Sequence, residues 1–339
     1  MRVPFVKEVH DATRYGFAVG KVRVLETRVF RAATYERLID APSFDEQRRI
    51  LSETPYGAFV EGAATADDVE AGLERALDEI YGFLVTAGLP DPVARFFRVR
   101  YDYANLRAVL KARLLGVPAD DLLVDLGTVD LETITGPTPG LPENLRAVAE
   151  GLEPVDGEDA VEGASPIAPE RIDAAVERAM FEDILACAKA SKSRFLRDLA
   201  ALEIDIANAK TAIRARRREL DASTLSGLLL PGGELEVADI QGAYELPFEE
   251  FIEVLARAPQ LKGVSAQDLL DAERLDVATD GLAVRFLRSG REVAIGPEPV
   301  IAYVMAREAE VRAVRTLLIG KLAGLGPDAL RNRLREVYV

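Results

Sequence analysis

One twelve-residue stretch occurs twice in this chain, as DYANLRAVLKAR from Asp102 to Arg113 and as DIANAKTAIRAR from Asp205 to Arg216. Both copies carry an acid, an Ala-Asn pair, a basic residue and a final Ala-Arg at the same offsets, and they start 205 − 102 = 103 residues apart. Two interpretations are open. The stretch could be a site for nucleotide or nucleic acid that is used twice, or one part of a longer internal repetition that sets the architecture of the chain.

Other segments recur at nearly the same distance, which favours a repetition. EAGLERAL begins at Glu70 and DAAVERAM at Asp173, and 173 − 70 = 103. GTVDLETI begins at Gly127 and the similar GELEVADI at Gly233, and 233 − 127 = 106. The segments keep the same order in each unit, as a tandem repetition requires.

A third, more divergent copy of the twelve-residue stretch lies near the end of the chain. It is EVRAVRTLLIGK, from Glu310 to Lys321, and it starts 310 − 205 = 105 residues after the second copy. Ala313 replaces the asparagine, whereas the acid and the basic residues Arg315 and Lys321 keep their offsets. The repetition therefore extends over most of the chain.

The spacing of apolar residues is helical along most of the sequence, and segments rich in proline and glycine separate the periodic stretches. We predict an all-α fold, with helices over residues 14–40, 66–87, 98–116, 170–190, 193–220, 265–288 and 299–323. We further predict three pseudo-repeated helical domains of about 100 residues. Their boundaries are 1–97 for repeat one, 98–200 for repeat two with an acidic loop at 153–169, 201–305 for repeat three, and 306–339 for closing helices that pack against repeat one.

The shared charges of the three copies are the candidate site. On a helical wheel, the acid of each copy and the base eleven positions later both border the apolar stripe. They are about 16 Å apart along the axis, so they cannot pair with each other and any ion pair goes to another helix. We predict inter-helix or inter-repeat contacts that fix how the units pack, or, as the alternative, ordinary solvated edge charges of little weight. The candidates are Asp102, Asn105, Arg113, Asp205, Asn208, Arg216, Glu310 and Lys321.

The composition argues against several classes of function. A net charge of −15 and a pI of about 4.8 are atypical of a nucleic-acid binder, and the basic run RARRREL at 214–220 suits a helix C-terminus or a partner contact better. The single histidine, His10, and the single cysteine, Cys187, offer little for a catalytic triad or a zinc site. Cys187 lies in an apolar helical stretch and is predicted to be a buried thiol. We expect no catalytic residue, no cofactor and no metal.

The location of the protein is predicted from what the sequence lacks. The N-terminus has no apolar core of a secretory signal, and no run of about 18 apolar residues is present. One cysteine cannot form an intramolecular disulfide. These features are typical of a reducing, cytoplasmic compartment.

Several segments, taken in order, resemble a known family. They are YGFAVGKVRVLETRVF, YDYANLRAVLKARLLG, LRDLAALEIDIANAKTAIRARR, LLLPGGEL and, most specific, VIAYVMAREAEVRAVRTLLIGKLAGL followed by LREVYV. Together they cover nearly the whole chain. They are similar to the central-axis subunit of the V/A-type rotary ATPases (ATP synthases), which is called the C subunit in prokaryotes and the d subunit in eukaryotes.

The resemblance implies a mechanical role. The family's fold is a funnel of three similar helical domains around a pseudo-threefold axis. The protein would sit on the cytoplasmic side of the membrane proteolipid ring and act as a socket for the central stalk, so that torque passes between the catalytic head and the ring. It would bind no nucleotide, nucleic acid or small-molecule substrate, and it would contact the membrane only through the ring. We expect one end of the funnel to be concave and the ring-facing end to be less charged.

Two other functions stay open. Long divergent helical repeats are also what a protein-interaction scaffold outside an ATPase would show. An enzyme with a diffuse carboxylate site is the third and least favoured possibility, because with 57 acidic residues pairs such as those in FEDI (181–184) and FEEF (248–251) are expected by chance.

Overall fold

A computed structural model describes residues 15–152 and 168–334, and within these ranges every regular element is an α-helix or a 3₁₀ helix. The prediction of an all-α fold is therefore confirmed. His10 and almost all of the predicted loop 153–169 lie outside the described residues.

Residues 15–86 form five α-helices and a 3₁₀ turn, which are α2 (Gly16–Leu25), η2 (Glu26–Arg28), α3 (Ala32–Asp40), α4 (Phe44–Ser52), α5 (Gly57–Val60) and α6 (Ala66–Thr86). The prediction of one helix over 14–40 is wrong, because the backbone is extended at Val29 and at Arg31. Phe30 lies buried in this break. The long α6 begins at a capping box, in which Thr65 and Asp68 each accept the backbone N–H of the other.

The middle of the chain contains two long helices separated by shorter ones: α7 (Asp91–Leu115), η3 (Asp120–Leu122), α8 (Leu131–Thr135), η4 (Thr138–Gly140), α9 (Glu143–Glu150) and α10 (Pro169–Ala190). α7 begins seven residues before its predicted start at 98. Pro92 lies in its first turn, where a backbone N–H has no acceptor within the helix. Proline, which lacks this N–H, therefore costs no hydrogen bond there. α7 ends at Gly116, which has the left-handed φ of 65° that glycine adopts without strain.

The last part continues with α11 (Arg194–Arg217), α12 (Ala222–Leu228), α13 (Val237–Tyr244), α14 (Phe248–Arg257), η5 (Pro259–Leu261), α15 (Ala266–Leu270), α16 (Ala272–Arg291), α17 (Glu298–Leu322) and α18 (Pro327–Arg333). The predicted helix 265–288 is in fact two helices, because the backbone of Asp271 is extended. The Asp271 carboxylate accepts the backbone N–H of Arg274, so this residue caps the start of α16.

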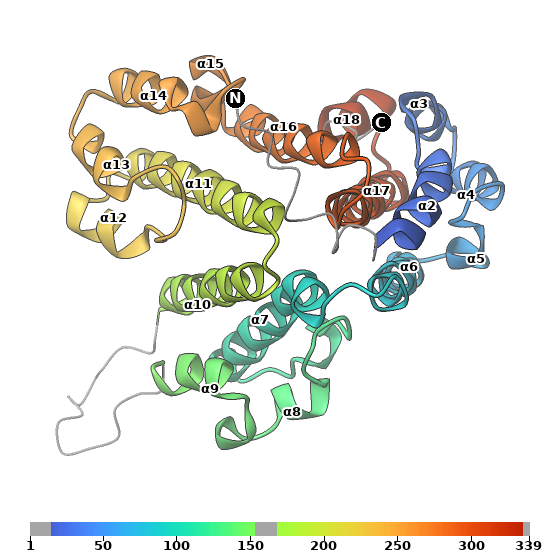
Figure 1. Cartoon of the computed structure of the whole chain (residues 1–339), viewed down its shortest axis with the longest axis horizontal. Helices are drawn as coiled ribbons and strands as arrows, with labels where there is room; N and C mark the ends of the chain where they lie inside the picture. Colours follow the sequence, from blue (N-terminus) through green and yellow to red (C-terminus); the bar gives the residue numbers. More distant parts are fainter. Residues whose placement is uncertain (1–14, 153–167, 335–339) are drawn as a thin grey trace.

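The three copies of the repeated stretch lie on α7, α11 and α17, which we call the inner helices. α7 packs along α10, α17 packs along α6, and α11 packs against both α10 and α16. α17 also contacts α2 and α4, and α18 contacts α3, so the two ends of the described chain lie side by side (Figure 1). The division into three domains with the boundaries given above, and their arrangement as a funnel, stay predictions.

Two hydrophobic cores hold the helices together, and α11 contributes to both. Its first half places Leu196, Leu199 and Ile204 in a large core with the helices of the N-terminal and middle parts. Its second half places Ile213 in a separate core that includes Phe251 of α14. The long helix therefore joins the group formed by α12 to α16 to the rest of the molecule.

Candidate functional site: the clasps of the inner helices

The acid in the first copy of the repeat binds backbone in front of a short helix. Asp102 Oδ1 accepts hydrogen bonds from the backbone N–H of Thr128 at 2.7 Å and of Val129 at 3.0 Å, and Oδ2 accepts from the Thr128 hydroxyl at 2.5 Å. The next residue, Asp130, caps α8 by accepting the backbone N–H of Thr133. Asp102 is only 2% exposed, so these three donors take the place of the water that would otherwise solvate its carboxylate.

The acids of the other two copies make the corresponding contact. Asp205 accepts from the backbone N–H of Glu234 at 3.2 Å and of Leu235 at 2.8 Å. Glu310 accepts from the backbone N–H of Phe30. In all three cases the last donor is the residue two positions before a short helix, which is α8, α13 or α3. All three acids are buried.

Two glycines make room for the aspartates. A Cβ atom on Gly127 would lie 2.2 Å from Asp102 Oδ1, and one on Gly233 would lie 2.1 Å from Asp205 Oδ1. Such distances are far below van der Waals contact, so only glycine lets the carboxylate reach the following N–H groups. In the third copy the acid is a glutamate, whose extra methylene reaches further, and Arg28 occupies the place of the glycine.

The asparagines bind both polar groups of one backbone residue. Asn105 accepts from the N–H of Val124 at 2.9 Å and donates to its C=O at 2.8 Å. Asn208 binds Leu230 in the same way, with both distances at 2.8 Å. These bonds satisfy backbone that lies outside any helix. Ala313 cannot make them.

The third copy holds a buried ion pair instead. Arg307 Nη1 donates to Glu310 Oε1 at 2.6 Å, and the two side chains are 8% and 1% exposed. The guanidinium also lies over the ring of Tyr56, 5.0 Å from its centre. Burial outweighs the neighbouring positive charge and raises the pKa of Glu310.

The base eleven positions after each acid donates to carbonyl oxygens at the far end of the same short helix. Its partners are Thr135 and Gly136 for Arg113 (3.3 and 2.7 Å), Leu246 for Arg216 (2.7 Å) and Ile39 for Lys321 (3.4 Å). Arg216 also lies over the ring of Tyr244, the last residue of α13. Basic side chains near the C-terminal carbonyls of a helix complement its dipole.

We call each set of acid, base and, where present, asparagine a clasp. The acid lies at the N-terminal end of a short helix and the base at its C-terminal end, so the two charges match the dipole of that helix. The acid and the base are about 16 Å apart along the inner helix, so they cannot pair with each other. The same separation lets them reach the two ends of a helix of one to two turns. Asp102 and Asp205 bind backbone N–H groups where an ion pair to another helix was expected. That the clasps fix the packing of whole units stays a prediction.

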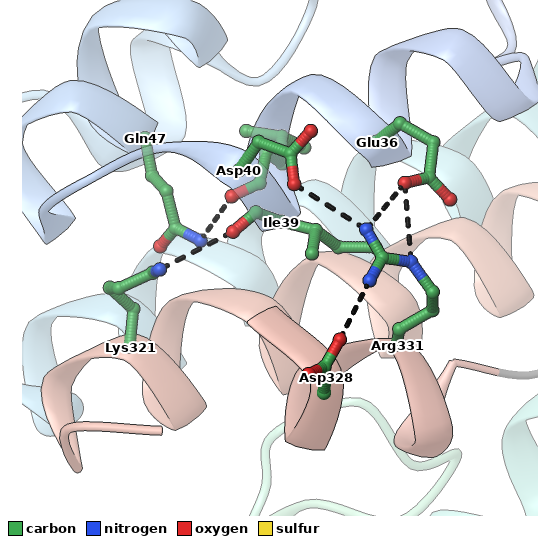
Figure 2. A network of polar contacts seen from close by, with 8 residues as sticks. Glu36, Ile39, Asp40, Gln47, Lys321, Asp328 and Arg331 are labelled. Atoms are coloured by element: carbon green, nitrogen blue, oxygen red, sulfur yellow. Dashed lines mark hydrogen bonds and ion pairs between the residues drawn. The ribbon is translucent and has the colours of Figure 1, made fainter. Parts of the chain in front are cut away.

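The third clasp is built from both ends of the chain. Figure 2 shows its far end, where Lys321 points at the carbonyl oxygen of Ile39. Arg331 of α18 lies next to it and contacts Glu36 at 2.9 Å and Asp40 at 3.4 Å, both on α3 (Figure 2). Arg331 and Glu36 are 295 positions apart in the sequence.

A second set of contacts, which the sequence analysis did not single out, joins each inner helix to a neighbouring long helix. The base five positions after each acid pairs with an acid there, and these acids are 173 − 70 = 103 and 276 − 173 = 103 residues apart. The pairs are Arg315–Glu70 (2.7 Å), Arg107–Asp173 (3.6 Å, with Lys111 closer at 2.7 Å) and Lys210–Asp276 (2.8 Å). The common spacing of EAGLERAL and DAAVERAM was the signal that could have identified them.

The remaining reactive and charged groups have structural surroundings. Cys187 is buried as predicted, and burial raises the pKa of its thiol. In the basic run 214–220, Arg214 lies 3.7 Å from Asp276, and Arg217 donates to the carbonyl oxygens of Leu269 and Leu270. Residues 15–152 and 168–334 contain no group of three metal-binding side chains and no helix long and apolar enough to cross a membrane.

Three long helices that each hold one short helix by its two ends place the described chain in the all-α class of proteins. Comparison with known sequences is more specific. The family model described as "ATP synthase (C/AC39) subunit" matches residues 18–333, and the chain belongs to this family. It is a C-type subunit of the V/A-type ATP synthases, so its partners include other subunits of such a complex.

Individual relatives match over nearly their whole length. The C subunit of the V-type sodium ATPase of Enterococcus hirae is 22% identical, with 94% of this chain and 97% of the relative covered. The C subunit of the V-type ATP synthase of Thermus thermophilus is 26% identical, with 93% and 96% covered. The C subunit of the A-type ATP synthase of Desulfurococcus is 24% identical, with 96% and 92% covered.

Substitution of the glycine beside Asp205 tests the second clasp. Gly233→Ala should lower the free energy of unfolding by about 2 kcal/mol or more, because the new methyl group displaces a buried carboxylate from its donors. Gly242→Ala, on an open face of α13, is the control and should raise it by about 0.5 to 1 kcal/mol through helix propensity. Urea unfolding followed by circular dichroism measures both. Equal effects at the two glycines would contradict the assignment.

The asparagine contact predicts a second loss of stability. Asn208→Ala leaves the buried N–H and C=O of Leu230 without their partner and should cost about 2 to 4 kcal/mol. Asn332→Ala, at an exposed position of α18, should change the free energy of unfolding by less than about 0.5 kcal/mol. Urea unfolding of both variants gives the two values. A cost at position 208 no larger than at position 332 would show that water replaces the amide.

The burial of Asp205 predicts a pH dependence with a definite sign. Burial raises the pKa of its carboxyl, against the lowering effect of the two N–H donors. A raised pKa in the folded state adds stability that is complete below the unfolded value of about 3.9 and is lost as the pH rises through the folded value. The stability advantage of wild type over Asp205→Asn, measured by urea unfolding, should therefore grow as the pH falls from about 7 towards 4. An advantage that shrinks over this range would show that the N–H donors dominate.

Proposed function

We propose that this chain is a non-catalytic central-stalk component of a rotary ATPase, a socket that couples the central stalk to the membrane proteolipid ring. It serves ATP-driven ion pumping or ATP synthesis from the cytoplasmic side, and it touches the membrane only through the ring. The observation that carries this proposal is the family match over residues 18–333, which spans nearly the whole described chain.

The clasps support a mechanical role. Hydrogen bonds are directional, so each inner helix holds its short helix at a fixed position and angle. Three units of this kind, arranged as a funnel around a pseudo-threefold axis, would form a stiff body between two partners. The repeated charges at Asp102, Asp205 and Glu310 thus serve geometry, and no substrate, nucleotide, nucleic acid or cofactor is needed to account for them.

Reconstitution of the complex with and without this chain tests the coupling role. Vesicles that contain the complete complex should show ATP-driven ion uptake, measured separately with a proton-sensitive and a sodium-sensitive dye. Omission of this chain should abolish ion uptake while the catalytic head still hydrolyses ATP, because the mechanical connection is lost. Uptake that persists without the chain would contradict the proposal.

Affinity purification of the tagged chain from its own cells separates this proposal from the alternatives. Stalk and proteolipid subunits should be identified together with it. Recovery of a soluble partner without those subunits would favour a helical-repeat scaffold outside an ATPase. Turnover of a substrate that depends on a single Asp or Glu would favour an enzyme.

A further inference from the structure

A polar cluster joins the inner helices two positions before the acid of each clasp. These equivalent positions are Arg100 on α7, Glu203 on α11 and Glu308 on α17. Arg100 Nη2 donates to Glu203 Oε2 at 2.7 Å, across one full period of 103 residues. The side chains are 34% and 16% exposed, so the pair is shielded from much of the solvent.

Two tyrosines connect Glu308 to the same cluster. The hydroxyl of Tyr81 on α6 donates to Glu308 Oε1 at 2.5 Å and lies 3.1 Å from the hydroxyl of Tyr101. Tyr101 is the residue after Arg100 on α7. Burial raises the pKa of Glu308, and the charges of Arg100 and Glu203 both act on it. The three inner helices therefore share one continuous group of polar side chains.

The Arg100–Glu203 contact differs from the clasps in what it joins. Each clasp joins one inner helix to a short helix, and each ion pair to α10 or α16 joins one inner helix to a neighbouring long helix. Arg100 instead reaches from α7 to α11, which both pack against α10. Its guanidinium also lies over the ring of Phe96, 5.4 Å from its centre, which limits the directions in which it can point.

We propose that Arg100 is a positioning residue that sets the orientation of α11 relative to α7, and with it the placement of the helices α12 to α16. The ion pair is a direct contact between α7 and α11. The two helical groups also meet where α16 packs along α17 and where Arg178 of α10 donates to the carbonyl oxygens of Gly227 and Leu229. The bond between a guanidinium and a carboxylate is directional, so it restrains the rotation of α11 against α7. Loss of Arg100 leaves each group folded and widens the range of angles between α7 and α11.

Distances between spin labels in the full-length chain test this proposal. Cys187→Ala removes the native thiol, and cysteines at the exposed positions Glu143 on α9 and Glu249 on α14 report the distance between the two groups. The parent should give one narrow distance distribution. Arg100→Gln and, from the other side of the pair, Glu203→Gln should each broaden the narrow peak. Arg100→Lys should broaden it as well, because an ammonium group keeps the charge but not the directional guanidinium.

Two controls separate positioning from a general loss of structure. Labels at Glu143 and at the exposed Lys189 of α10 lie in the same group, and their distance should not change in any variant. Arg315→Gln breaks an ion pair of the same 2.7 Å length and the same 34% arginine exposure elsewhere in the chain, and it should leave the Glu143–Glu249 distance unchanged. A narrow peak that survives Arg100→Gln, or broadens equally in Arg315→Gln, would overturn the proposal.

Discussion

The structure depends on a buried carboxylate that accepts backbone N–H groups just in front of a short helix. Burial of a charge costs free energy unless donors replace its water, and a non-helical backbone N–H inside a protein needs an acceptor. At Asp102 and Asp205 the backbone N–H groups replace the water of the carboxylate, and the carboxylate is the acceptor that the N–H groups need. The bond therefore works only where the carboxylate can come close, which explains why a glycine stands at 127 and at 233.

The sequence predicted the fold class, the burial of Cys187 and the repeated helix, because helical spacing and a period of 103 residues are visible without partners. It did not predict the end of the first helix at Val29, since residues 15–30 have helical spacing throughout and the bond to Glu310 comes from 280 positions away. Nor did it identify the partners of the acids. A helical wheel places a charge on a helix face, but a backbone N–H group leaves no pattern in the side chains.

The third inner helix shows how much the arrangement can vary. In α17 an alanine stands in place of the asparagine and a glutamate in place of the aspartate, yet the contact in front of the short helix is kept. Arg307, three positions before the acid, pairs with Glu310, whereas the asparagines of the other copies bind backbone. A longer acid needs no glycine opposite it, and Arg28 stands at that position. The position of the short helix is therefore the property that all three copies share, and the residues that achieve it differ.

The long separation between Phe30 and Glu310 has a consequence for synthesis of the protein. The ribosome adds about 5 to 20 residues per second, so a gap of 280 residues corresponds to roughly 15 to 60 s. During that time the apolar side chains of Phe30, Tyr35 and Tyr56 lack the helix that covers them. The segment around Phe30 is therefore among the last to reach its final surroundings, and its apolar side chains stay without their cover until α17 has left the ribosome.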